Sequence, residues 1–182
     1  YIDYFITGEG EWFFDRFLSG TEILCSNING NQVAIQPHDE LIETDKIYEP
    51  LSGNRLNTMI DGSVFLELTR GCPYRCSYCY YSRNYQNVRE IPFDTLTNVI
   101  KKRRDISEIY ILCPTFDRSP DFTEKLRMLK NLKHNVRLHT EMRTDRITPE
   151  VAKLIYNAGF RSLEVGLQSL NKRALSSVNR DS

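Results

Sequence analysis

The sequence predicts an α/β protein in which about four β/α units lie on a parallel sheet, preceded by a β-hairpin connector and a single β-α unit. Three observations predict this class. From residue 63 onward, short apolar segments alternate with amphipathic helical segments, as in parallel β/α units. Two β-rich runs flank Asn29-Gly30, a dipeptide typical of hairpin turns. Hydrophobic residues make up 40% and charged residues 26% of the 182 residues, which is a globular composition.

The first part of the chain is predicted to contain a strand, a glycine turn and a short helix ending at Gly20. A single β-α unit cannot bury both of its faces. We therefore interpret residues 1–20 as the end of a domain that was cut away, and the chain as a fragment. Residues 21–35 are the predicted hairpin. Residues 36–62 are polar and irregular, and we expect an extended connector there.

The repeating units follow in residues 63–182. The predicted strands cover residues 63–69, 109–113, 136–140 and 161–167. The predicted helices start with Asp94 as N-cap, with Ser119 as cap before Pro120, with Thr148 before Pro149, and near Asn171. The first helix runs to Lys102, the second to Leu132 and the third to a C′ glycine, Gly159. The fourth is predicted to continue to Ser182, where the chain stops.

Charge and cysteine content exclude several classes of protein. Lys+Arg and Asp+Glu are equal at 24 each, so we expect no nucleic-acid partner and no attraction to an anionic membrane. No apolar run approaches the roughly 20 residues of a membrane span. The five cysteines are an odd number, and three crowd one loop, unlike a secreted disulfide scaffold. We expect a reducing, cytoplasmic location.

The loop GCPYRCSYCY, residues 71–80, contains Cys72, Cys76 and Cys79. Thiolates bind iron–sulfur clusters, and zinc also accepts them. A disulfide would leave one thiol unpaired, and a structural zinc site usually takes four ligands. Three thiolates on a four-iron cubane would leave one iron without a protein ligand. The loop follows the first predicted strand, at the edge of a parallel sheet where active sites lie.

The segment FLELTRGCPYRCSYCYY resembles the cluster-binding loop of radical S-adenosylmethionine (SAM) enzymes. The resemblance implies that Cys72, Cys76 and Cys79 hold a [4Fe–4S] cluster whose open iron chelates the amino and carboxylate groups of SAM. An electron from the cluster would cleave SAM to a 5′-deoxyadenosyl radical that abstracts hydrogen from the substrate. It also implies that the β/α units form part of a (β/α)6 TIM-like barrel.

Three later segments, IYILCPTFDRSPDF, LHTEMRTDRIT and LEVGLQSLN, resemble the subgroup that carries a cobalamin-binding domain ahead of the radical core. The resemblance departs at two positions, because Cys113 replaces the usual Asp and Asp117 replaces the usual Asn. No catalytic residue is predicted. The residues implied in SAM binding are Tyr78, Pro114, Thr115, Glu141, Arg143, Glu164 and Gln168.

The resemblance covers nearly the whole chain. Residues 1–20 are similar to the end of the cobalamin-binding Rossmann domain, residues 21–62 to the connector, and residues 63–182 to a truncated radical SAM core. Cobalamin is implied only for a full-length protein. The resemblance further implies a small-molecule or metabolite substrate, an external electron donor of the flavodoxin or ferredoxin type, and a fragment incomplete for turnover.

Two other functions stay open at this point. A non-catalytic zinc-binding module would use the same thiols for one colourless metal. An RNA-modifying radical enzyme of the methylthiolating kind would share much of the core. That enzyme would need a basic RNA-binding domain and usually a second set of three cysteines upstream, and the sequence shows neither.

Overall fold

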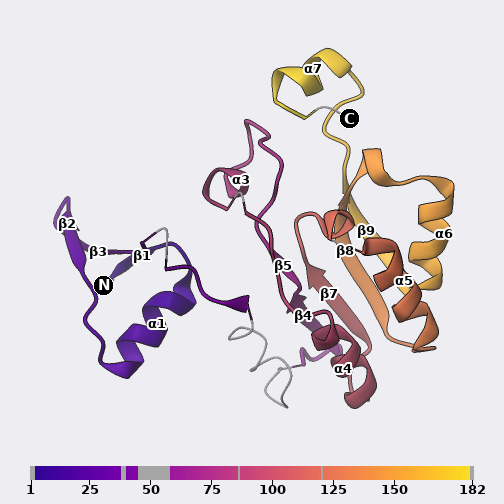
Figure 1. Ribbon diagram of the computed structural model, residues 1–182, viewed down its shortest axis with the longest axis horizontal. Helices are drawn as coiled ribbons and strands as arrows, with labels where there is room; N and C mark the ends of the chain where they lie inside the picture. The colour runs from indigo at the N-terminus through magenta and orange to yellow at the C-terminus, as the bar shows by residue number, and fades with distance from the viewer. Residues whose placement is uncertain (1–2, 38–39, 45–57, 86, 120, 181–182) are drawn as a thin grey trace. The chain divides into compact units, whose positions relative to one another are not determined.

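The computed structural model describes residues 3–37, 40–44, 58–85, 87–119 and 121–180. The chain divides into two compact units, Tyr1–Ile47 and Tyr48–Ser182, and each is described by itself (Figure 1). Much of the predicted connector, including Pro50, lies outside the described residues. No helix in the described ranges is long and apolar enough to cross a membrane.

The first unit is a three-stranded sheet with one helix. Its elements are β1 (Phe5–Thr7), α1 (Gly10–Ser19), β2 (Cys25–Ile28) and β3 (Asn31–Ile35). The predicted hairpin is confirmed, since β2 and β3 pair antiparallel around two residues with positive φ, Asn29 and Gly30. The sequence offers no earlier strand to pair with β1, but β1 pairs in parallel with β3. The α1 crossover makes this parallel pairing feasible.

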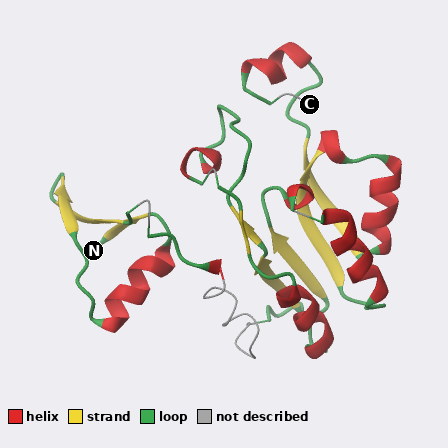
Figure 2. Cartoon of the chain, viewed as in Figure 1, coloured by secondary structure: helices red, strands yellow, loops and turns green. Residues whose placement is uncertain are grey.

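The second unit is built on a four-stranded parallel sheet with the order β4-β7-β8-β9 (Figure 2). Its strands are β4 (Ser63–Glu67), β7 (Glu108–Leu112), β8 (Arg137–Arg143) and β9 (Phe160–Gly166). Its main helices are α4 (Asp94–Lys102), α5 (Phe122–Asn131) and α6 (Pro149–Asn157). The parallel sheet and the alternation of strand and helix confirm the predicted α/β class.

The hydrophobic core lies between one face of this sheet and the helices. It includes Leu66 of β4 and Leu138 of β8, both fully buried, together with Leu96 of α4, Leu129 of α5 and Ile155 of α6. Each side chain of this size contributes about 1.5 to 3 kcal/mol when buried. The helices of the first three predicted β/α units therefore share one core, and none of the described residues of α7 belongs to it.

The opposite face of the sheet carries a row of rings. Phe65, Tyr110 and His139 are register partners on successive strands, with ring centroids 5.2 Å and 4.5 Å apart. The row continues to Ser162, whose Oγ lies 2.7 Å from His139 Nδ1. Phe65 is 48% exposed, so this face is not packed like the helical face.

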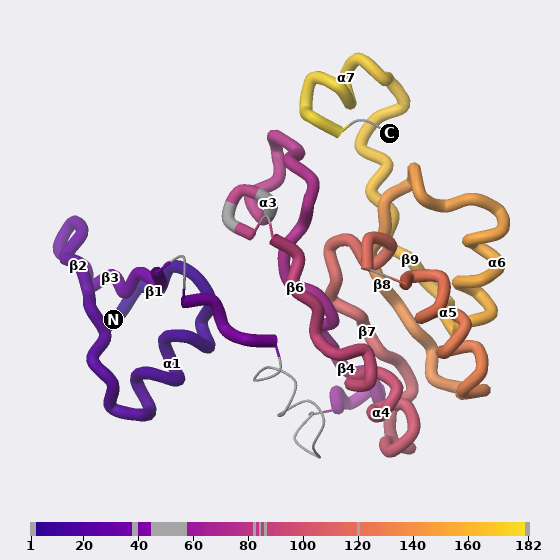
Figure 3. Tube along the Cα trace, viewed as in Figure 1, coloured from indigo at the N-terminus to yellow at the C-terminus, as the bar shows by residue number. Residues whose placement is uncertain are grey.

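Several short elements were not predicted. They are β5 (Thr69–Arg70), α3 (Tyr81–Asn84), β6 (Arg89–Glu90) and the 3-10 helices η1 (Phe116–Arg118) and η2 (Thr144–Arg146). β5 pairs antiparallel with β6, so the two ends of the cysteine-containing segment lie side by side (Figure 3). The predicted first strand, residues 63–69, accordingly divides at Leu68 into a parallel strand and the start of this ribbon.

Helix ends were predicted with mixed success. Thr148 caps α6 by accepting a hydrogen bond from Val151 N, and Asn171 caps α7 (Lys172–Ser177). Gly159 follows α6 with a φ of 102°, as expected for a C′ residue.

Three predicted helix ends were wrong. Phe93 precedes α4, and Asp94 is its first residue. The N-cap of α5 is Asp121, because Ser119 instead hydrogen-bonds Glu90; the predicted Pro120 lies outside the described residues. α7 ends at Ser177 and does not continue to Ser182.

Candidate cofactor site

The cysteine loop, residues 71–80, begins where β5 ends. Gly71 turns the chain with a φ of 94°, and a Cβ there would stand 2.0 Å from Asn87 O, so only glycine fits. Backbone hydrogen bonds hold the loop on both sides. Cys72 N donates to Tyr85 O at 2.8 Å, and Ser77 N donates to Val178 O at 2.9 Å.

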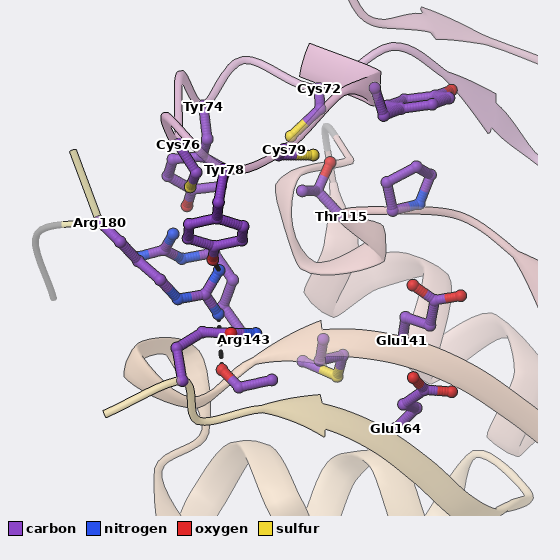
Figure 4. Close-up of a pocket in the computed structure, with 15 residues that line it drawn as sticks. Cys72, Tyr74, Cys76, Tyr78, Cys79, Thr115, Glu141, Arg143, Glu164 and Arg180 are labelled. Atoms are coloured by element: carbon purple, nitrogen blue, oxygen red, sulfur yellow. Dashed lines mark hydrogen bonds between the residues drawn. The ribbon is translucent and has the colours of Figure 1, made fainter. Parts of the chain in front are cut away.

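A cavity of about 450 Å³ lies beneath this loop, at the carboxyl ends of the parallel strands (Figure 4). Residues from the cysteine loop, from α3, from β8 and β9, and from the segments after β7, β9 and α7 line it. The lining residues are Cys72, Tyr74, Cys76, Tyr78, Cys79, Tyr81, Pro114, Thr115, Glu141, Met142, Arg143, Glu164, Gly166, Gln168 and Arg180. All ten residues predicted as metal or cofactor ligands are among them. The structure thus brings these ten residues together, and their binding roles stay a prediction.

The three cysteines of the loop are free thiols that line the cavity. All five cysteines of the chain lie in the described ranges, and none forms a disulfide. Cys72 and Cys76 are buried, and Cys79 is half-buried. Burial raises the pKa of the Cys72 thiol, opposed by a backbone hydrogen bond and by the Arg143 guanidinium. Within the described residues, no three Cys, His, Asp or Glu side chains have the spacing of a site for one metal ion.

The chemistry of the cavity fits a cluster with a polar organic cofactor beside it. Three soft sulfur side chains, the donors that hold iron–sulfur clusters, come from one loop. Thr115 is only 3% exposed, and its Oγ1 has no hydrogen-bond partner among the described residues. Because a buried hydroxyl is normally satisfied, an unpaired one on a cavity wall indicates a ligand with polar atoms.

Two carboxylates face the same cavity. Glu141 of β8 and Glu164 of β9 are direct register partners, and Figure 4 shows their side chains beside each other. Partial burial and the nearby Glu164 charge raise the pKa of Glu141. Such a pair accepts hydrogen bonds from hydroxyl or ammonium groups.

Two arginines also line the cavity, and the sequence predicted only one of them. Arg143 was predicted, and its guanidinium carbon lies 4.0 Å from the centroid of the Tyr74 ring. Arg180 was missed. Its guanidinium donates to Tyr78 Oη at 2.9 Å and to Gly166 O at 2.6 Å. No local motif marks Arg180, since only the return of the chain after α7 brings it to the loop.

Cys113, which replaces the usual Asp, is not a lining residue of the cavity. Its side chain is 1% exposed and lies 2.5 Å from the Thr69 hydroxyl. Burial raises its pKa to about 11, so it is a protonated thiol at neutral pH. The hydrogen bond joins β5, which leads into the cysteine loop, to the end of β7.

Comparisons with known proteins give a family match and two structures of similar fold. A family model described as the Radical SAM superfamily matches residues 66–182, whereas no curated protein sequence matches the chain. Two solved structures of the radical S-adenosylmethionine methyltransferase TsrM, from Kitasatospora setae, have a similar fold. The structure with tryptophan and a SAM analogue bound has a TM-score of 0.70 at 18% identity, over 94% of this chain and 38% of that chain.

The second TsrM structure, with cobalamin and a [4Fe–4S] cluster bound, has a TM-score of 0.56 at 21% identity, over 67% of this chain and 24% of that chain. The described protein therefore spans well under half the length of TsrM. At these identities the likeness shows a shared fold.

Proposed function

The chain belongs to the Radical SAM superfamily, and we propose that its Cys72, Cys76 and Cys79 hold a [4Fe–4S] cluster beside a bound SAM molecule. The resemblance stated from the cysteine loop is thereby confirmed at the level of the superfamily. One observation carries the proposal. The three thiols and all seven residues predicted to contact SAM line a single cavity at the carboxyl ends of parallel strands.

Together, the cluster and SAM supply one-electron radical chemistry, and the proposed reaction is reductive cleavage of SAM. The protein's own groups have distinct tasks. The buried Thr115 hydroxyl offers a hydrogen bond to the cofactor. The Glu141 and Glu164 carboxylates suit ribose hydroxyls or an ammonium group, and the Arg180 guanidinium suits a carboxylate. The Tyr78 ring, on the same wall, offers a face for adenine.

The narrower placement is also part of the proposal. The fold likeness to TsrM supports the cobalamin-associated group, with cobalamin bound only in a full-length protein. We propose that the β4-β7-β8-β9 sheet is part of a (β/α)6 barrel, because its helices cover one face alone. A small-molecule substrate and an external flavodoxin- or ferredoxin-type electron donor belong to the same proposal.

Anaerobic reconstitution with iron and sulfide tests the cluster. The wild-type chain is expected to bind about four irons, to show the electron paramagnetic resonance (EPR) signal of a reduced cubane, and to release 5′-deoxyadenosine from SAM with dithionite. Cys72→Ala, Cys76→Ala and Cys79→Ala are each expected to lose all three properties. Cys25→Ser is the matched control, because Cys25 lies in β2 of the other unit. A colourless wild-type protein that binds zinc alone would contradict the proposal.

Methyl transfer is a second candidate, favoured by the fold likeness to a methyltransferase. SAM with a radiolabelled methyl group distinguishes the two in a full-length protein supplied with cobalamin. Methyl transfer would move the label to the product and leave S-adenosylhomocysteine. Reductive cleavage would leave the label in methionine and yield 5′-deoxyadenosine.

A further inference from the structure

Tyr74, between Cys72 and Cys76 in the loop, lies against two guanidinium groups. The Arg143 guanidinium carbon is 4.0 Å and that of Arg118 is 4.9 Å from the centroid of its ring. Arg118 Nε also donates a hydrogen bond to Tyr74 Oη. Arg118 ends η1, and Arg143 ends β8. The ring thus connects the cysteine loop with the segments that follow β7 and lie at the end of β8.

The two contacts differ in strength. Arg143 is 4% exposed, and its Nε is held by Asp145 Oδ1 at 2.7 Å. A cation over an aromatic face is attracted more strongly when both are removed from water. Arg118 is exposed, so its contact is weakened by solvent. Arg143 is therefore the principal partner of the Tyr74 ring, and it lines the same cavity as Cys72 and Cys76.

We propose that Tyr74 is a positioning residue, clasped by Arg143 and Arg118, which holds the Cys72–Cys76 segment in its ligand-binding shape before any cluster is present. The buried Arg143 has a second role, since a fixed positive charge stabilises the reduced and more negative state of a cluster. The second role rests on the function proposed above, whereas the first concerns the protein alone.

Hydrogen–deuterium exchange of the cluster-free full chain tests the positioning role. The amides of Cys72 and Ser77 are the reporters, because both donate backbone hydrogen bonds that anchor the loop. Tyr74→Leu is expected to speed their exchange at least tenfold. Tyr80→Leu is the matched control, since Tyr80 is in the same loop and 78% exposed, and it should leave both rates unchanged.

Tyr74→Phe separates the ring from its hydroxyl. It keeps the face that Arg143 contacts and loses only the Arg118 hydrogen bond, so exchange close to that of the wild type is expected. If Tyr74→Leu fails to fold, a similar failure of Tyr74→Phe would overturn the proposal that contact with the ring face holds the loop. If Tyr74→Leu folds, unchanged exchange at Cys72 and Ser77 would overturn it.

The charge role is tested by the reduction potential of the reconstituted cluster, measured by EPR-monitored titration. Arg143→Gln is expected to shift the potential to more negative values. Arg143→Lys keeps the charge but loses the planar stack, so it should keep a potential near that of the wild type and speed exchange by less than Tyr74→Leu does. Equal potentials in Arg143→Gln and the wild type would overturn the charge role. A wild-type chain that assembles no cubane would refute the proposed function, while the exchange experiment would still decide the clasp.

Discussion

At the scale of single residues, Asp117 is an ionisable side chain in a buried position. It replaces the Asn expected from the resemblance and is 2% exposed. Neither of its side-chain oxygens has a hydrogen-bond partner among the described residues. Its ion-pair partner is Arg146 Nε, at 3.5 Å from Oδ2. Burial raises the pKa of Asp117 above its ordinary value of 3.8, despite that arginine.

This raised pKa predicts a pH dependence of stability. Between 3.8 and its higher folded pKa, Asp117 binds its proton more tightly in the folded than in the unfolded chain. The free energy of unfolding therefore falls as pH rises through that window and stays lower above it. We expect Asp117→Asn to remove this fall and to raise the neutral-pH free energy of unfolding by about 1 kcal/mol.

Urea titrations from pH 4 to pH 7 check this expectation. Asp121→Asn is the control, because Asp121 is exposed and adopts a left-handed conformation that Asn also tolerates. An Asp117→Asn profile parallel to that of the wild type would show that the Asp117 carboxylate is solvated in the folded protein.

The residues of the site were predictable to the extent that chemistry is encoded locally. Cys72, Cys76 and Cys79 follow from spacing and residue type within ten positions. The Tyr74 clasp does not, because Arg118 and Arg143 come from other elements. Arg180 is absent from the prediction for the same reason. A contact between distant residues leaves no periodic trace in one sequence.

At the scale of elements, β4 shows how sheet alternation divides its side chains. Leu66 is fully buried against the helices, whereas its neighbour Phe65 is 48% exposed on the opposite face. Successive side chains of a strand point to opposite faces.

Adjacent substitutions in β4 test this division. Leu66→Ala is expected to lower the free energy of unfolding by about 2 to 5 kcal/mol through transfer and cavity terms. Phe65→Ala should cost roughly 1 kcal/mol or less, because the exposed ring leaves no cavity. Chemical denaturation followed by circular dichroism provides both values. Equal costs would mean that the ring row is packed in solution.

The turn that leads into the cysteine loop requires glycine at position 71. Gly71→Ala would place a methyl group 2.0 Å from Asn87 O at a positive φ. We expect loss of the loop and a marked fall in iron bound per chain after reconstitution. Gly30→Ala shares the positive φ (82°) but meets no atom within 4 Å. Gly30→Ala should lower the thermal midpoint slightly and keep the full iron content. If both variants lost iron equally, the clash with Asn87 O could not be the cause.

Helix boundaries were predicted where the capping side chain bonds within its own helix. Thr148 accepts a hydrogen bond from Val151 N and caps α6 as expected. Ser119 was predicted as a cap by the same rule, but it hydrogen-bonds Glu90, which β6 brings near. Asp94 similarly enters the first turn of α4 without capping it. Capping rules describe what a side chain can do, and tertiary neighbours decide whether it does so.

At the scale of the whole molecule, strand order follows chain order in the parallel sheet. Consecutive β/α units are usually neighbours in a parallel sheet, so the pattern of segments predicted the parallel sheet, and the structure adds its strand order. The pairing of β1 with β3 was not predicted, because nothing in either strand specifies its partner.

Two separate hydrophobic clusters, one in each unit, predict separate unfolding transitions. The single tryptophan, Trp12, belongs to the first cluster with Phe13 and Ala34, so its fluorescence reports that unit. Leu66 belongs to the second cluster. We expect Leu66→Ala to lower the thermal midpoint seen by circular dichroism and to leave the fluorescence midpoint unchanged. An equal shift of both midpoints would show that the two units unfold together.

The hydrogen bonds that join Val178 and Arg180 to the cysteine loop have a consequence for biosynthesis. Tyr78 and Arg180 are separated by 102 positions, which a ribosome adds in about 5 to 20 s. Until Arg180 has been made, the thiols of the nascent chain lack these distal anchors. Iron delivered earlier would meet an unclosed loop, so cluster insertion is expected to follow the synthesis of residue 180.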